Sequence, residues 1–104
     1  MSENKHDALL EYLVRGFMTL QDTEECLKFL RDLCTESELQ EMSRRLQAAK
    51  MLRNGRIYAD IAEDTGLSTA TISRVNRALR YSTDGYARVL ETLELQEKRE
   101  RRGR

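Results

Sequence analysis

The chain has 104 residues, of which 35% are charged, 6% are aromatic and none is proline. That length suits one domain with one core, and the frequent Leu, Ala, Glu, Arg, Lys and Met favour helix and argue against a β-sheet. The formal net charge is zero, and no window nears the run of about 18 apolar residues that a membrane span needs, so we exclude a membrane protein and expect a cytoplasmic one.

Two helices are predicted in the amino-terminal third. Apolar residues at spacings of three and four mark the first helix, and they are Leu9, Leu10, Leu13, Val14 and Phe17. Asp22 is expected to cap the second helix, with Glu25 in the reciprocal position of a capping box. This helix should end near Cys34, and we expect Cys26 and Cys34 to be reduced and buried.

The longest helix is predicted to begin at Thr35, which forms a second capping box with Glu38. Its apolar stripe consists of Leu39, Met42, Leu46, Ala49 and Leu52. Asn54 and Gly55 should end it. Because aromatic residues are few, one chain has little material for a core, and we expect a homodimer.

Two short helical units follow, over residues 57–65 and 68–81, and their arrangement predicts a helix-turn-helix from about Ile57 to Leu79. Its interior positions are expected to be Ile61, Thr65, Leu67, Ile72 and Val75. Of these, Thr65 is less apolar than ideal. Ala62 is small where the two helices cross, and Gly66 lies where the turn requires positive φ.

The second of these units carries side chains suited to a DNA groove. Hydroxyl groups can bond phosphates or base edges, a methyl group can touch thymine, and arginine can reach phosphate or guanine. The expected DNA contacts are Ser68, Thr69, Ala70, Thr71, Ser73, Arg74, Arg77, Arg80 and Arg56. Ser68 is also the expected helix cap.

The charge distribution agrees with this assignment. Residues 1–43 hold four basic and ten acidic residues, a net charge of −6, and this half should avoid DNA. Residues 44–80 hold eight basic and three acidic residues, a net charge of +5, which favours phosphate binding. The alternative is that these two short helices have only a structural role and pack in a helical bundle. The charge and the positional pattern together favour DNA binding over this alternative.

A last helix is predicted to begin at residues 82–84 and to bury Tyr86, Val89, Leu90 and Leu93. We expect one domain over residues 1–104, with residues 1–5 and 97–104 flexible. The arginines of that tail, Arg99, Arg101, Arg102 and Arg104, could add weak contacts to the DNA backbone.

Four motifs give the chain a resemblance to the Trp repressor family, and in particular to its Trp-repressor-related YerC/YecD branch. They are Thr-Glu-Ser-Glu-Leu at 35–39, Ser-Arg-Arg-Leu at 43–46, Leu-Arg-Asn-Gly at 52–55 and the stretch from Thr65 to Leu79. The resemblance covers nearly the whole chain. It implies six helices, an intertwined homodimer built from the amino-terminal helices, and a recognition helix in each of two major grooves about one turn apart.

The resemblance also implies an effector site. In the Trp repressor a threonine and two arginines hold tryptophan, at positions that match Thr35, Arg45 and Arg74. A pocket-lining glycine of that repressor is replaced by Val75, and a ligand-binding serine by Ala78. Because Val75 adds bulk where a flat ring would enter and Ala78 lacks the hydroxyl, we expect DNA binding without tryptophan. The alternatives are purely structural roles for these three residues, or a different small carboxylate effector.

The predicted function is therefore a sequence-specific regulator of transcription, a repressor that binds double-stranded DNA as a homodimer and needs no cofactor. One rival is an adaptor that binds protein or RNA through the same helices, with the acidic half as a docking face. The other is an enzyme, which we do not expect. His6 is the sole histidine, the cysteines have no metal-ligating neighbours, and no nucleophile with a base can be assembled.

Overall fold

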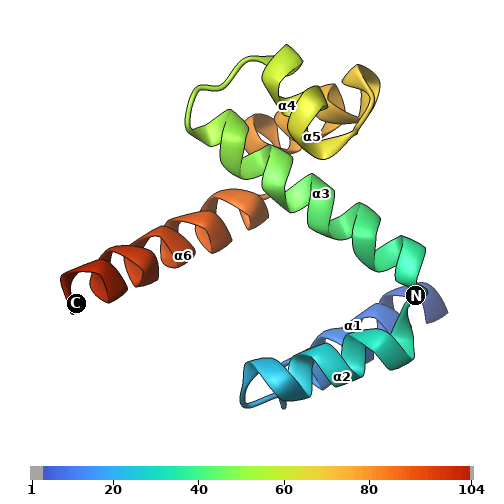
Figure 1. The fold of residues 1–104 in the computed structure, drawn as a ribbon. Helices are drawn as coiled ribbons and strands as arrows, with labels where there is room; N and C mark the ends of the chain where they lie inside the picture. The colour runs from blue at the N-terminus through green and yellow to red at the C-terminus, as the bar shows by residue number, and fades with distance from the viewer. Residues whose placement is uncertain (1–3, 104) are drawn as a thin grey trace. The chain divides into compact units, whose positions relative to one another are not determined.

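The computed structural model describes residues 4–103, and the described part of the chain consists of six α-helices without a strand (Figure 1). The chain divides into two compact units, of which the first ends at Leu39 and the second begins at Gln40. The expectation of flexibility at residues 1–3 and at Arg104 lies outside the described residues. The expected all-α fold is confirmed.

The first unit contains α1 (Lys5–Phe17) and α2 (Thr23–Leu33). Asp22 caps α2 by accepting a hydrogen bond of 2.9 Å from the Glu25 amide, as predicted, and the Glu25 carboxylate accepts one of 2.8 Å from the Gln21 amide. Phe17 and Phe29 pack edge to face between the two helices, with ring centroids 5.1 Å apart. Neither helix contains a buried residue, so this unit by itself has no enclosed core.

Helix α3 (Glu36–Arg53) begins and ends as the sequence predicts. The Thr35 hydroxyl accepts from the Glu38 amide at 3.0 Å, and the Glu38 carboxylate accepts from the Thr35 amide at 2.8 Å. At the other end Gly55 adopts a φ of +83°, and the Arg56 amide donates to the Met51 carbonyl at 3.0 Å. This left-handed closure stops the helix and turns the chain toward the next one.

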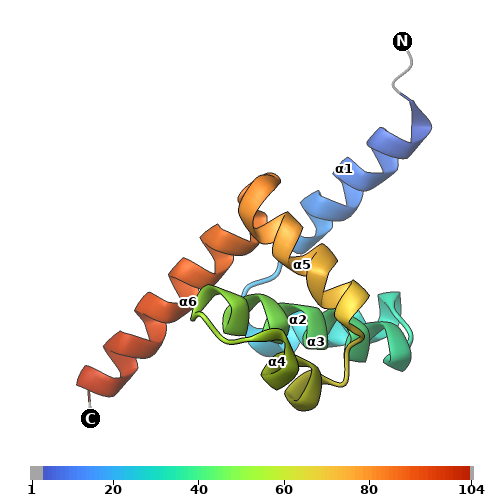
Figure 2. The ribbon, with the colours of Figure 1, turned by 90° about the horizontal axis from the view of Figure 1, so that it is seen from above.

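The second unit holds the core of the molecule. Helices α4 (Tyr58–Thr65) and α5 (Thr69–Tyr81) pack together beside the carboxyl-terminal end of α3 (Figures 1 and 2). Ile61 and Ile72 are its largest fully buried side chains. The buried apolar residues are Ala48, Ala49, Met51, Leu52, Ile61, Leu67, Ile72, Val75 and Leu90.

Helix α6 (Gly85–Arg102) begins where the sequence predicts but differs from the prediction in two respects. It continues through Arg102, past residue 97, where the sequence analysis placed the start of the tail. Two ion pairs with α3, Arg53 to Glu94 at 3.0 Å and Lys50 to Glu97 at 3.8 Å, hold its middle section. Moreover, only one of its four expected core residues is buried.

That burial prediction was wrong for Val89 and Leu93, which are 51% and 38% exposed, while Tyr86 is half-buried and Leu90 is buried. The predicted burial of Cys26 and Cys34 was also too strong, because both are free thiols that are only half-buried. On α6 the apolar pattern marked a face of which only Leu90 is buried, and in the first unit it marked two thiols that are only partly covered.

No helix in residues 4–103 is long and apolar enough to cross a membrane. Among the same residues, no three His, Cys, Asp or Glu side chains gather in a way that could hold a metal ion.

Candidate nucleic-acid interface

The interior of the predicted helix-turn-helix is confirmed residue by residue. Each of its five expected positions is buried, with Ile61 and Ile72 inaccessible to solvent and Thr65, Leu67 and Val75 at most 7% exposed. Ala62 is half-buried against the same cluster, as its small size at the crossing predicts. Helices α4 and α5 therefore form one rigid element that fixes the direction in which α5 presents its other face.

The turn between α4 and α5 is closed by three hydrogen bonds. Gly66 adopts the predicted positive φ of +75°, and its amide donates to the Ala62 carbonyl at 2.8 Å. The Thr65 hydroxyl donates to the Ile61 carbonyl at 2.7 Å and accepts from the Leu67 amide at 3.2 Å. A residue that seemed too polar for its interior position thus satisfies two backbone groups.

Ser68 caps α5, as predicted. Its hydroxyl accepts from the Thr71 amide and donates to the Thr71 hydroxyl, both at 3.1 Å. These two side chains therefore serve first to begin the helix. Of the residues expected to contact DNA, they are the two whose hydroxyls are already engaged with each other.

Four other expected contacts on α5 project from the helix with free polar groups or charges. Within residues 4–103, the side chains of Thr69, Ser73, Arg74 and Arg77 form no hydrogen bond or ion pair. Thr69, Arg74 and Arg77 are exposed, and so is the methyl group of Ala70. At 100° per residue, Ala70 and Arg77 lie nearly opposite the inner line of the helix, which consists of the buried Ile72 and Val75 and the half-buried Leu79.

The remaining two expected contacts, Arg80 and Arg56, have partners within the chain. The Arg80 guanidinium donates to the Asn76 side chain at 2.9 Å. Arg56 pairs with Asp60 at 3.3 Å, at the start of α4, with both side chains about half exposed. Such exposed pairs are weak, so both guanidinium groups stay available to a phosphate.

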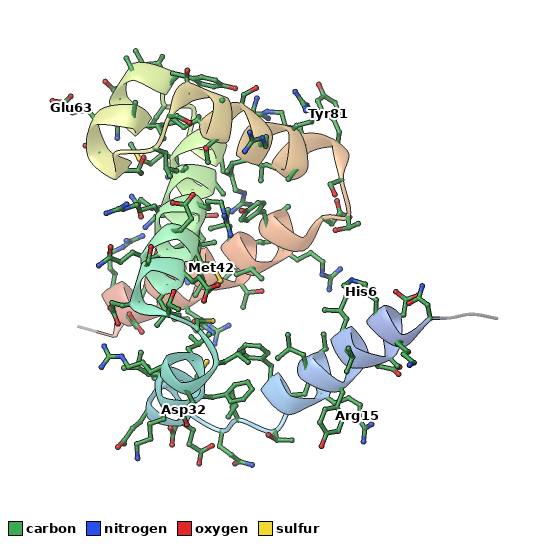
Figure 3. The ribbon with its side chains drawn as sticks, turned by 90° about the vertical axis from the view of Figure 1, so that its right-hand side faces the viewer. His6, Arg15, Asp32, Met42, Glu63 and Tyr81 are labelled. Carbon is green, nitrogen blue, oxygen red and sulfur yellow. The ribbon has the colours of Figure 1, made fainter. Side chains whose placement is uncertain are left out.

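Tyr81 belongs to the same face and was missed by the sequence analysis. It is the last residue of α5 and is 81% exposed, and its ring points away from the helices of this unit (Figure 3). The spacing in the sequence could have identified it, because Tyr81 follows Arg77 by four residues and Ala70 by eleven. Residues at these separations lie on the same face of a helix.

The residues of the implied effector site have separate local roles. Thr35, in the first unit, caps α3 through the hydroxyl described above. In the second unit Arg45 lies 3.8 Å from the Glu41 carboxylate, whereas Arg74 is exposed. Val75 is 3% exposed and belongs to the core. Ala78 is half-buried and lines a shallow open groove with Leu46, Tyr86 and Val89.

The chain is similar in sequence to a known protein family and to a protein of Bacillus subtilis. Residues 8–94 match the family described as Trp repressor protein. The uncharacterized protein YerC of Bacillus subtilis is 48% identical over 82 residues, which is 79% of either chain.

Two solved structures are also similar. The structure of a TrpR-like protein from Eubacterium eligens has a TM-score of 0.80 and 50% identity, and covers 84% of this chain and 90% of that one. A provisionally assigned Trp repressor from Staphylococcus aureus has a TM-score of 0.79 and 46% identity, over 84% of this chain and 87% of that one.

Proposed function

Because the chain belongs to the Trp repressor family, we propose that it is a cytoplasmic transcriptional regulator that binds double-stranded DNA through α5. We propose further that it acts as a repressor, as a homodimer, and without tryptophan. One observation carries the DNA-binding proposal: α5 is fixed by the buried side chains of Ile72 and Val75, while its outer face holds polar and basic groups without partners in the described chain.

The chemistry of that outer face suits a major groove. Arg74 and Arg77 can each bind a phosphate or the edge of a guanine. Thr69 and Ser73 can donate to and accept from base edges, and the Ala70 methyl can contact thymine. The amino-terminal end of α5 has no acidic residue in its first turn, so nothing there repels a phosphate.

The homodimer is supported by the apolar surface of the first unit. In α1, Leu9 and Leu10 are 70% and 51% exposed, and in the adjoining turn Met18 is 80% exposed. A chain with 39% hydrophobic residues that leaves whole helices without a buried side chain has apolar surface left for a partner. A second copy also offers charge complementarity, since the acidic segment 1–43 and the basic segment 44–80 carry opposite charges.

Independence from tryptophan is supported by the positions of two side chains. Val75, which replaces a pocket-lining glycine of the Trp repressor, is enclosed in the core and belongs to the packing of α5 itself. Arg45 is within reach of the Glu41 carboxylate, which gives its charge a partner without a ligand. A different small carboxylate effector is the alternative that these contacts favour less.

The experiment is a salt titration of binding to duplexes enriched from a random pool, for the wild type and two variants. Arg77→Ala removes a charge from the outer face of α5, and Arg31→Ala removes one from the exposed surface of α2 in the acidic half. The proposal requires that Arg77→Ala reduces the magnitude of the slope of log affinity against log salt by about two, about one for each chain of the dimer, and that Arg31→Ala leaves it unchanged.

Equal slopes for all three proteins would show that Arg77 makes no phosphate contact and would remove the proposal that DNA binds through the outer face of α5. A folded protein that enriches no duplex would instead favour the adaptor, whose partner would be a protein or an RNA. The acidic amino-terminal segment is the feature that favours that second candidate.

A further inference from the structure

The hydroxyl of Thr65 lies at the point where α4 ends and the turn to α5 begins. The residue is only 7% exposed, and its hydroxyl bridges the Ile61 carbonyl, one turn back in α4, and the Leu67 amide, two residues ahead. It thereby links the last turn of one helix to the residue that precedes the cap of the next.

No other group in residues 4–103 accepts the Leu67 amide hydrogen. The preceding amide, that of Gly66, donates to the Ala62 carbonyl and completes the backbone closure of α4. Leu67 is itself buried, with 7% of its surface exposed, so water has little access to its amide. A buried amide without an acceptor is costly, and the side chain of Thr65 removes that cost.

An apolar residue of the same shape would fill the interior position but would leave this amide unpaired. Valine has the volume of threonine without the hydroxyl, and at this position it would satisfy the apolar pattern of the helix-turn-helix better than threonine does. The choice of a polar residue in the core is therefore explained by the turn rather than by the packing.

We propose that Thr65 is a positioning residue for DNA recognition, which rests on the proposed function. Its hydroxyl fixes the backbone at Leu67, the residue directly before the Ser68 cap. The cap in turn determines where α5 begins, and therefore where Thr69 and Ala70 lie on its outer face. Without the hydroxyl the Leu67 amide loses the one acceptor that it has within residues 4–103, and the leading residues of α5 shift relative to α4. Contacts at base edges need sub-ångström placement, whereas phosphate contacts tolerate a shift.

Loss of the Thr65 hydroxyl should reduce the selectivity of DNA binding more than its affinity for any duplex. In Thr65→Val, binding to a duplex enriched from a random pool weakens by about tenfold, while binding to an unrelated duplex at the same salt changes by less than about threefold. Hydrogen exchange at the Leu67 amide, followed by NMR on the protein without DNA, accelerates by about tenfold or more, and that at the Ile72 amide, inside α5, does not.

Two further variants keep the test specific. Thr65→Ser retains the hydroxyl and loses the methyl group, and it restores both the selectivity and the slow exchange at Leu67. Thr92→Val is the matched control, because the Thr92 hydroxyl also donates to a carbonyl four residues back, that of Arg88 at 3.1 Å, but accepts from no amide. This variant behaves as the wild type in both measurements.

The outcomes distinguish this inference from the function on which it rests. A wild type that enriches no duplex overturns the proposed function, and the positioning role with it. A wild type that does, combined with a Thr65→Val protein that keeps its selectivity or its slow Leu67 exchange, overturns the positioning role alone. Equal weakening on both duplexes, or a Thr65→Ser protein as defective as Thr65→Val, also overturns it and leaves Thr65 a structural residue.

Discussion

Arg74 and Val75 are adjacent in sequence but lie on different faces of α5, about 100° apart around the helix axis. Arg74 is exposed and its guanidinium has no partner within residues 4–103, whereas Val75 is 3% exposed and packs with Ile72 in the core. One residue therefore belongs to the outer surface of the helix-turn-helix, and the next belongs to the framework that holds this surface in place.

Substitutions at these two positions should accordingly have different effects. We expect Val75→Ala to lower the free energy of unfolding by about 1.5–3 kcal/mol, because it removes two buried methyl groups and leaves a void. Arg74→Ala should change it by less than about 0.5 kcal/mol, because an exposed, unpaired side chain contributes little. Urea denaturation followed by circular dichroism measures both. A loss below about 0.5 kcal/mol for Val75→Ala would contradict its place in the core, and a loss as large for Arg74→Ala as for Val75→Ala would contradict the surface role of Arg74.

Gly66 should resist substitution for a reason of backbone conformation. No atom lies within 4 Å of a Cβ built on it, so an added methyl group meets no steric obstacle, but its φ of +75° is unfavourable for any L-residue with a side chain. We expect Gly66→Ala to lower the free energy of unfolding by about 1–2 kcal/mol.

The matched control for that substitution is Gly85→Ala. Gly85 has ordinary φ, begins α6, and its added Cβ would only touch the Thr83 hydroxyl at 3.9 Å. The same denaturation experiment should show no loss of stability for this variant, since alanine favours helix over glycine. If the two alanine variants were equally destabilised, backbone strain would not be the cause.

Asp60 should limit the contribution of Arg56 to DNA binding. Their guanidinium and carboxylate lie 3.3 Å apart on the surface at the start of α4, and a phosphate must compete with this carboxylate. We expect Asp60→Asn to strengthen DNA binding by about twofold to fivefold, partly through the freed arginine and partly through the lost negative charge.

A double variant separates these two causes. In the Arg56→Ala background, Asp60→Asn should strengthen binding less than it does in the wild type, as measured by fluorescence anisotropy with a labelled duplex. An equal gain in both backgrounds would mean that Asp60 acts only through its charge and that Arg56 does not reach the DNA.

Leu9 should contribute to the association of two chains. It is 70% exposed on α1, and burying the apolar face of this helix against a second copy would make a carboxylate at this position unfavourable. We expect Leu9→Asp to shift the molecular mass from dimer to monomer in light scattering after gel filtration. Lys28→Asp introduces the same residue on the exposed surface of α2 and should leave the dimer intact. A dimer unaffected by Leu9→Asp would place the interface elsewhere.

Local sequence signals predicted the helix boundaries well. The capping boxes at Asp22 and Thr35, the stops at Gly55 and Gly66, and the cap at Ser68 each depend on residues within five positions of one another, so the sequence contains the whole interaction. The five interior positions of the helix-turn-helix were also predicted correctly, because their spacing is a property of two helices joined by one short turn.

Features that depend on distant neighbours could not be predicted in this way. The stripe on α6 marks an apolar face, but whether Val89 and Leu93 are covered depends on what packs against them. The ion pair of Glu97 with Lys50, which lies 47 residues earlier, also could not be predicted from local spacing. The hydroxyl of Thr65 could not be assigned from the pattern, since its role depends on the direction of a single amide in the turn.

The most direct test of the central claim is selection of bound sequences from a random pool of duplex DNA, at near-physiological salt, with and without tryptophan. If α5 recognises DNA in a dimer that needs no corepressor, both arms enrich the same motif, with two half-sites related by two-fold symmetry and about one helical turn apart. A motif that appears only with tryptophan would contradict the role assigned to Val75. No enrichment in either arm, from a protein that is folded and dimeric, would contradict the DNA-binding function itself.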